Sequence, residues 1–393
     1  REQLVQNIDD GILREGAKAV IEGAARGNQG MHQRAIAACA MALDQNPETE
    51  QWLDWMFTPE GGGLPGVIVG GIDRDGVGAE AAPGYALSWG VNIGSVADWL
   101  ADYPGYEKHS IYRDYPQFKA TFTAGWNIGI LGYSSPNVGD TGSTGSTGLV
   151  AASPESIIRG YRYLGDPMIA LAAYHANSQS AEGLGRDIFD ADPDRIGRET
   201  AALAERVTGN PFEGGHNMAG YGLASVEYGW GKGGTGMWMY YGRNGGHGHL
   251  DRLNIDVYYR GLCMMPDLGY PEYATSWPQR NYFTNNTISH NTVIVDQLPQ
   301  AVNWVGHPEL FCQFANFGAV RVDSREVYAG VQRYQRTAAF VRVGEGQGYV
   351  VDFFRIKGGK DHLYVLHGPP GEVTTEGLEL TAQEGGSYAG ADV

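Results

Sequence analysis

Two histidines separated by one residue, His247 and His249, have the types and spacing in this chain that most directly suggest chemistry. A carboxylate, Asp267, and a third imidazole, His290, follow further along the chain. Neutral imidazoles with a carboxylate suit a divalent ion such as zinc, held by three protein ligands with a further position left open. If the pair lies on a strand, both side chains project from one face, because side chains alternate there with a period of two. One histidine could then hold the metal while the other faces a substrate.

Composition limits which partners such a site can serve. The chain of 393 residues has 28 basic and 45 acidic residues, which gives a formal net charge of −17. This balance argues against a nucleic acid or an anionic membrane as partner, since both require a basic surface, but it does not exclude an anionic sugar. The 3 cysteines are too few for a disulfide framework or a zinc–thiolate site. We find neither a signal peptide nor an apolar run of membrane-spanning length, and we expect both ends to be cut from a longer precursor.

The elements that must position these residues change in character near residue 209. Before it, Ala-rich stretches with helical spacing predict helices over 13–25, 33–43, 85–100 and 118–131. Ser153 followed by Pro154 is typical of a helix start, and a further helix is expected over 192–207. Helices joined by loops rich in Gly and Pro indicate stacked helical hairpins.

After residue 209 the pattern is typical of strands. Residues 253–259 alternate between apolar and polar, which predicts a half-buried strand. Further strands are expected over 236–241, 292–295, 317–322, 338–343, 348–356 and 362–367. Several short strands separated by turns favour an antiparallel sandwich. We therefore predict an α+β multidomain protein, with a helical domain at 1–208 and an antiparallel β-sandwich domain at 209–393.

The order of a helical half followed by His-x-His at the start of a β half resembles the heparinase II/III-like polysaccharide lyases. That family pairs an (α/α) toroid with an antiparallel β-sandwich. Residues 247–251 resemble its His-x-His-x-Asp segment, in which the first histidine faces the substrate and the second binds zinc. Asp267 and His290 lie in segments similar to the family's Asp-x-Gly-Tyr and His-Asn-Thr-Val ligand segments. The resemblance implies that His249, Asp267 and His290 bind one divalent ion, most simply Zn²⁺, with a mainly structural role.

The turn Gly27-Asn28-Gln29-Gly30 resembles the family's Asn-His-Gly turn, whose asparagine contacts the uronate carboxylate. Gln29 stands where the family has histidine, and His32 lies one turn further on. The resemblance implies a catalytic role for Asn28 and substrate contacts for Gln29 and His32. Family members usually carry several helical hairpins before this turn, so we expect an incomplete toroid here.

Residues 76–85 resemble the family segment that delivers the catalytic tyrosine, which implies that Tyr85 acts together with His247. Trp89, one turn beyond Tyr85, is predicted to stack on a sugar ring, although a core position is an equal alternative. Tyr273, close after the Asp267 segment, is a further candidate acid.

The resemblance implies a secreted or periplasmic lyase that cleaves an acidic, uronate-containing polysaccharide by β-elimination. A glycosaminoglycan, alginate and an exopolysaccharide all remain open as substrate, and the oligomeric state is not indicated. Tyr85 and His247 would supply the base and the acid; which removes the C5 proton stays open, because it depends on C5 stereochemistry. Two alternatives remain. One is a metal-dependent hydrolase of the His-x-His-x-Asp type, although Arg252 follows Asp251 where those enzymes continue with histidine. The other is a non-catalytic protein that binds acidic sugars on the lyase scaffold.

Overall fold

The computed structural model describes residues 1–142, 148–150, 152–270, 279–344, 346–372, 374–379 and 381. The chain divides into two compact units, one of residues 1–79, 86–125 and 151–209, the other of residues 80–85, 126–150 and 210–393. Two segments of the predicted helical half, 80–85 and 126–150, therefore belong to the second unit. These two segments carry Tyr85 and Asp140, which both take part in the site described below.

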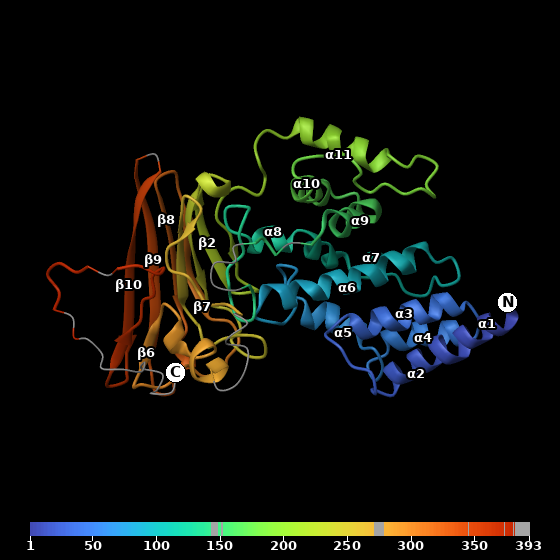
Figure 1. The fold of residues 1–393 in the computed structure, drawn as a ribbon, viewed down its shortest axis with the longest axis horizontal. Helices are drawn as coiled ribbons and strands as arrows, with labels where there is room; N and C mark the ends of the chain where they lie inside the picture. Colours follow the sequence, from blue (N-terminus) through green and yellow to red (C-terminus); the bar gives the residue numbers. More distant parts are fainter. Residues whose placement is uncertain are drawn as a thin grey trace. The chain divides into compact units, whose positions relative to one another are not determined.

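The first unit is built from helices joined by loops of varied length (Figure 1). Three of the segments are π-helical or 3₁₀-helical: η1 (Asp9–Arg14), η2 (Val67–Gly71) and η3 (Pro116–Phe122). The α-helices are α1 (Glu2–Ile8), α2 (Glu15–Ile21), α3 (Met31–Leu43), α4 (Glu48–Phe57), α5 (Leu64–Gly66), α6 (Pro83–Asp102), α7 (Ile111–Asp114), α8 (Ala124–Ile128), α9 (Pro154–Leu164), α10 (Pro167–Ala176) and α11 (Arg195–Arg206). Helices α6 and α8 each continue from one unit into the other along the chain.

Local sequence explains where several of these helices begin and end. The Ser153 side chain accepts a hydrogen bond from the Ser156 amide at the start of α9, and Pro154 occupies the first turn, as predicted. Helix α9 ends at Gly165, whose φ of 63° is a left-handed conformation that suits glycine. The single helix expected over 118–131 is wrong. The chain instead forms η3 and the short α8, which ends at Ile128, and Leu131 adopts a φ of 54° that a continuing helix could not contain.

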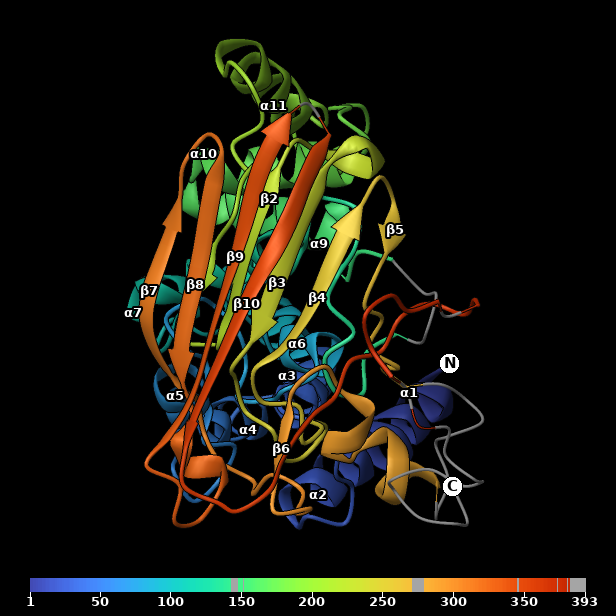
Figure 2. The same ribbon diagram turned by 90° about the vertical axis from the view of Figure 1, so that its left-hand side faces the viewer.

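The second unit contains a five-stranded sheet of order β1-β2-β3-β4-β5, a four-stranded sheet of order β10-β9-β8-β7, and the two-stranded sheet β11-β6. Every strand pair is antiparallel. The bounds are β1 (Asn217–Met218), β2 (Leu223–Tyr228), β3 (Thr235–Tyr240), β4 (Asn254–Tyr259), β5 (Leu262–Cys263), β6 (Val293–Val295), β7 (His307–Gln313), β8 (Phe317–Asp323), β9 (Arg333–Gly344), β10 (Gln347–Lys357) and β11 (His362–Tyr364). Figure 2 shows the four-stranded sheet in front of the five-stranded one.

The two larger sheets pack face to face around one apolar core. Alternate residues point into it, as the period of two requires: Val226 on β2 and Met237 on β3 are paired across the five-stranded sheet, and Val320 on β8 is paired with Ala338 on β9 in the other. All four side chains are buried. The predicted antiparallel β-sandwich is therefore confirmed. The seven predicted strands are all present, and β1, β2, β5 and β7 are additional.

Candidate functional site

Three buried side chains of the second unit, His249, Asp267 and His290, form the one group within the described part of the chain that could hold a metal ion. One ligand atom from each lies within 4.8 Å of the others. His249 comes from the loop between β3 and β4, and Asp267 from the loop after β5. His290 directly follows the 3₁₀ helix η7 (Thr287–Ser289) and lies three residues before β6. Asn254, at the start of β4, ties two of these loops together. The side-chain Nδ2 of Asn254 donates to Asp267 Oδ2 (2.7 Å), and its side-chain Oδ1 accepts from the backbone amide of Asn291 (2.9 Å).

The donor chemistry of this group fits a divalent ion. His249 Nδ1 and His290 Nε2 are buried and make no hydrogen bond, which is costly for a polar atom unless a ligand satisfies it. Burial lowers the pKa of His249, which favours the neutral imidazole that metals bind. Burial also opposes charge on Asp267 and His290, but their mutual attraction and hydrogen bond (2.9 Å) outweigh it. The pKa of Asp267 is consequently lowered and that of His290 raised.

His247 stands beside this group but does not belong to it. Its ring is stacked on that of Tyr85, with 3.6 Å between ring centroids and an interplanar angle of 7°. The His247 side chain keeps 37% of its exposure, so a ligand can reach it, and its Nε2 lies 4.0 Å from Glu80 Oε2. The structure thus brings together Tyr85 and His247, which the sequence placed in a common catalytic role.

The ionisation of Tyr85 is affected by its surroundings. Burial raises the pKa of the phenol, and the neighbouring Tyr270, Asp140 and Glu80 raise it further. Arg280 has the opposite but smaller influence. The Tyr85 hydroxyl therefore keeps its proton at neutral pH, which suits a proton donor better than a base.

Asp140 is the acidic residue of the site that sequence reasoning did not assign. Its side chain is 2% exposed and contacts three partners: His247 Nδ1 at 3.0 Å, His249 Nε2 at 3.2 Å and Arg280 Nη2 at 2.6 Å. Burial alone would raise the pKa of this carboxyl, but hydrogen bonds from these three groups outweigh burial and lower it. Asp140 is therefore an ionised carboxylate shared by the metal-ligand group and by His247.

The segment that carries Asp140 is held on the site by its backbone. The Asp140 amide donates to the His247 carbonyl oxygen (2.9 Å), and the Tyr270 amide donates to the Gly142 carbonyl oxygen (2.8 Å). Gly139 has a φ of +56°, and an added Cβ there would lie 2.3 Å from the His247 carbonyl oxygen. Glycine is required at this close approach.

His247 and His249 do not lie on a strand, so the alternation of strand side chains does not apply to them. They lie in a glycine-rich turn and loop between β3 and β4, where no ladder fixes the backbone. Gly246 adopts a φ of 65°, and a Cβ at Gly248 would lie 2.8 Å from the Ala81 side chain. Both imidazoles nevertheless meet the same residue, because each contacts a different oxygen of Asp140.

Four of the predicted residues belong to the first unit. Asn28 lies in the turn before α3, where its carbonyl oxygen accepts from the Met31 amide (3.0 Å). Gln29 and His32 line a cavity of about 380 Å³ together with Trp55 and others. His32 Nε2 accepts a hydrogen bond from the Gly27 amide (3.3 Å).

Trp89, the fourth, lies in the interior of the first unit. It is 7% exposed, and a Cβ at Gly78 would lie 2.5 Å from its ring. The burial of Trp89 agrees with the core position, the alternative that the sequence left open. Tyr273 lies outside the described residues.

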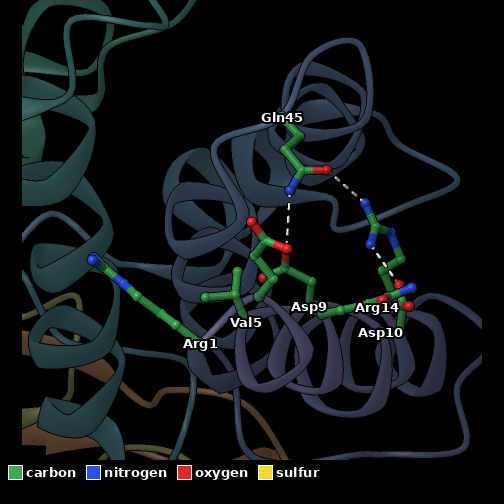
Figure 3. Close-up of a pocket in the computed structure, with 8 residues that line it drawn as sticks. Arg1, Val5, Asp9, Asp10, Arg14 and Gln45 are labelled. Atoms are coloured by element: carbon green, nitrogen blue, oxygen red, sulfur yellow. Dashed lines mark hydrogen bonds and ion pairs between the residues drawn. The ribbon is translucent and has the colours of Figure 1, made fainter.

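A larger cavity, of about 630 Å³, lies among the first helices of the same unit (Figure 3). Asp9 and Gln45 are joined there by a hydrogen bond of 3.0 Å, and Arg14 reaches both Gln45 and Asp10. None of its lining residues is a predicted site residue.

Among the helices of the described residues, none has both the length and the apolar character needed to span a membrane.

Part of the chain matches the model of a known protein family. Residues 237–343 match the family model "Heparinase II/III-like, C-terminal", a stretch that includes His247, His249, Asp267 and His290. A search of curated proteins finds no match. Over these residues, the match confirms the resemblance predicted from the sequence.

Solved structures share the fold of both units. A heparinase III gene product is 16% identical, with 90% of this chain and 50% of that chain covered and a TM-score of 0.59. A mutant heparan sulfate lyase from Pedobacter heparinus is 15% identical, with 86% and 47% covered and a TM-score of 0.59. A further heparinase III is 13% identical, with 86% and 49% covered and a TM-score of 0.61. The chain therefore spans about half the length of these proteins, and the predicted class, part of an (α/α) toroid followed by a β-sandwich, is confirmed.

Proposed function

We propose that this protein is a polysaccharide lyase that cleaves an acidic, uronate-containing polysaccharide by β-elimination. The observation that carries the proposal is the stack of Tyr85 on His247 beside Asp140, next to a buried group of metal-ligand type. The names of the structurally similar proteins, heparinase III and heparan sulfate lyase, agree with this class. Because such polymers are extracellular, we propose a secreted or periplasmic location.

In the proposed reaction, a base takes the C5 proton of the uronate, and its electrons form the C4–C5 double bond as the C4–O4 bond breaks. The leaving O4 receives a proton from an acid, so one proton is taken up and one is given. His247 is the proposed base and Tyr85 the proposed acid, because the phenol is held in its protonated form. The developing negative charge on the carboxylate needs a preorganised donor, and Asn28 is the residue proposed for it.

We propose that His249, Asp267 and His290 hold one divalent ion, most simply Zn²⁺. When bound, the ion would connect three loops of the second unit and would satisfy buried imidazole nitrogens that lack a hydrogen bond. Its role would be to fix the loop that carries His247. Neither His247 nor Asp251 belongs to the ligand group found in the described residues, which disfavours a two-metal hydrolase.

The test is ultraviolet absorbance of the conjugated, unsaturated product, measured with zinc supplied across a panel of glycosaminoglycans, alginates and bacterial exopolysaccharides. We expect absorbance to rise with at least one polymer. New reducing ends without absorbance would establish a hydrolase instead. Polymer binding without either signal would establish a sugar-binding protein.

A Tyr85→Phe variant tests the catalytic assignment. We expect kcat to fall by about 10²- to 10⁴-fold, because the variant loses the proton donor. KM should change little, since the phenyl ring can keep its stack on His247. Tyr349→Phe, at a residue that is 53% exposed on β10, is the matched control and should leave kcat unchanged. Undiminished activity of Tyr85→Phe would exclude Tyr85 as the acid.

A further inference from the structure

Asp140 contacts two imidazoles at once, and the two contacts use different ring nitrogens. Oδ2 lies 3.0 Å from Nδ1 of His247, and Oδ1 lies 3.2 Å from Nε2 of His249. An ionised carboxylate can only accept hydrogen bonds, so each of these nitrogens must carry the proton. A neutral imidazole has one N–H and one bare nitrogen. The bare nitrogens are then Nε2 of His247 and Nδ1 of His249.

Both bare nitrogens are placed where an acceptor is useful. Nδ1 of His249 is buried without a hydrogen bond and belongs to a residue of the metal-ligand group. Nε2 of His247 belongs to a side chain that is 37% exposed and stacked on Tyr85. One carboxylate therefore makes one histidine available to an ion and its neighbour available to a substrate.

Arg280 accounts for how the Asp140 carboxylate, which has almost no exposure, stays charged. Its Nη2 lies 2.6 Å from Asp140 Oδ2, and its guanidinium lies 5.0 Å from the centroid of the Tyr270 ring. A buried charge without such a partner would be strongly disfavoured. The Arg280 contact thus leaves Asp140 able to accept from both histidines.

We propose that Asp140 is a positioning residue that sets the tautomers of His247 and His249 together, and so couples metal binding to the orientation of the base. For His249 this is the carboxylate–histidine–metal arrangement, in which the carboxylate orients the ligand ring. For His247 it is the arrangement in which a buried carboxylate holds a general base in its productive tautomer. The part concerning His247 rests on the proposed lyase function, whereas the part concerning His249 does not.

Asp140→Asn is the direct test, because asparagine has one acceptor oxygen and an amide that cannot accept from the second ring. We expect zinc affinity, measured by competition with a chromogenic chelator, to fall by about 10- to 100-fold. We expect kcat to fall by at least about 10²-fold, with KM within about threefold. Asp361→Asn, on an exposed loop of the same unit, is the control and should change neither quantity.

A second measurement does not depend on any variant folding. In wild-type protein with ¹⁵N-labelled histidine at about pH 8, two-bond ¹H–¹⁵N correlations distinguish the tautomers of neutral imidazoles. We expect His247 to carry its proton on Nδ1 and, in the zinc-free protein, His249 to carry its proton on Nε2. The opposite tautomer at His247, or unchanged zinc affinity in a folded Asp140→Asn protein, would overturn the proposal. If no polymer is cleaved, the lyase proposal fails, but the zinc and tautomer measurements still decide the role of Asp140.

Discussion

Replacement of Glu227 by glutamine should stabilise this protein at alkaline pH and not at acid pH. Glu227 lies on β2 with 2% exposure, on the face of the sheet opposite to the core residue Val226. Its Oε2 accepts from the Leu131 amide (2.6 Å), and its Oε1 accepts from the Ser225 hydroxyl. Because Leu131 belongs to the segment 126–150, this contact fastens to the sheet the same segment that carries Asp140.

The magnitude follows from the ionisation of the buried carboxyl. Burial raises the pKa of Glu227 from 4.5 to about 7, despite hydrogen bonds from Ser225 and Leu131 that lower it. The folded state therefore binds a proton more tightly than the unfolded state does. Stability from this group is fully present below pH 4.5 and is lost as pH rises through about 7. This difference in pKa between the unfolded and folded states corresponds to about 3 kcal/mol of folding free energy, since a tenfold change in proton affinity is worth about 1.4 kcal/mol.

Glutamine preserves the shape and can accept from the Leu131 amide while donating to Ser225, but it cannot ionise. The free energy of unfolding in urea, followed by tryptophan fluorescence, should be measured for both proteins at about pH 4.5 and about pH 8. We expect the Glu227→Gln protein to gain about 3 kcal/mol relative to wild type between these two pH values. Glu376→Gln, at an exposed glutamate, should show no such gain. A difference between the Glu227→Gln protein and wild type that is the same at both pH values would refute the reasoning.

Two further predictions concern the metal-ligand group and its loop. A chelator should lower the Tm of the wild-type protein in calorimetry but leave the Tm of His249→Ala unchanged, because an ion present at about 100 times its Kd stabilises by about 2.7 kcal/mol; an equal decrease in both would exclude the site. Gly139→Ala should lower both Tm and kcat, because the new Cβ would lie 2.3 Å from the His247 carbonyl oxygen on a backbone with φ +56°. Gly148→Ala, where nothing lies within 4 Å of the added Cβ, should match wild type in both measurements.

Periodicity predicted most of the fold, and its failures have physical causes. The strand β4 alternates in polarity and was found, whereas β2 (Leu223–Tyr228) is buried on both faces and includes Ser225 and Glu227. A strand enclosed on both sides has no need to alternate, so its sequence lacks the period-two signal. The helix expected over 118–131 failed for the opposite reason. Its apolar spacing was helical, but the glycines at 125, 129 and 132 and the left-handed Leu131 allow the chain to leave the helix.

The three metal ligands could be predicted because each lies in a short segment that is recognisable by itself. The structure brings these three side chains together. Asp140 was not assigned a role, although its segment, Pro136-Asn137-Val138-Gly139-Asp140, resembles a family loop near the cleft. The contacts of Asp140 with His247 and His249 span 107 and 109 residues. A single sequence does not specify contacts of that range. Only the positive φ of Gly139 is a local feature, and a glycine before an aspartate is too common to mark a site.

The position of Asp140 changes what a structural metal can do in such a site. An ion held by His249 need not touch the substrate to affect the reaction, because the carboxylate that orients His249 also orients His247. Loss of the ion would leave the His249 ring held by Asp140 alone, so both this ring and the carboxylate it contacts would be less firmly oriented. The same carboxylate would then restrain His247 less firmly. Catalysis and metal occupancy are thus expected to decline together, although the metal ligands and the base are different residues.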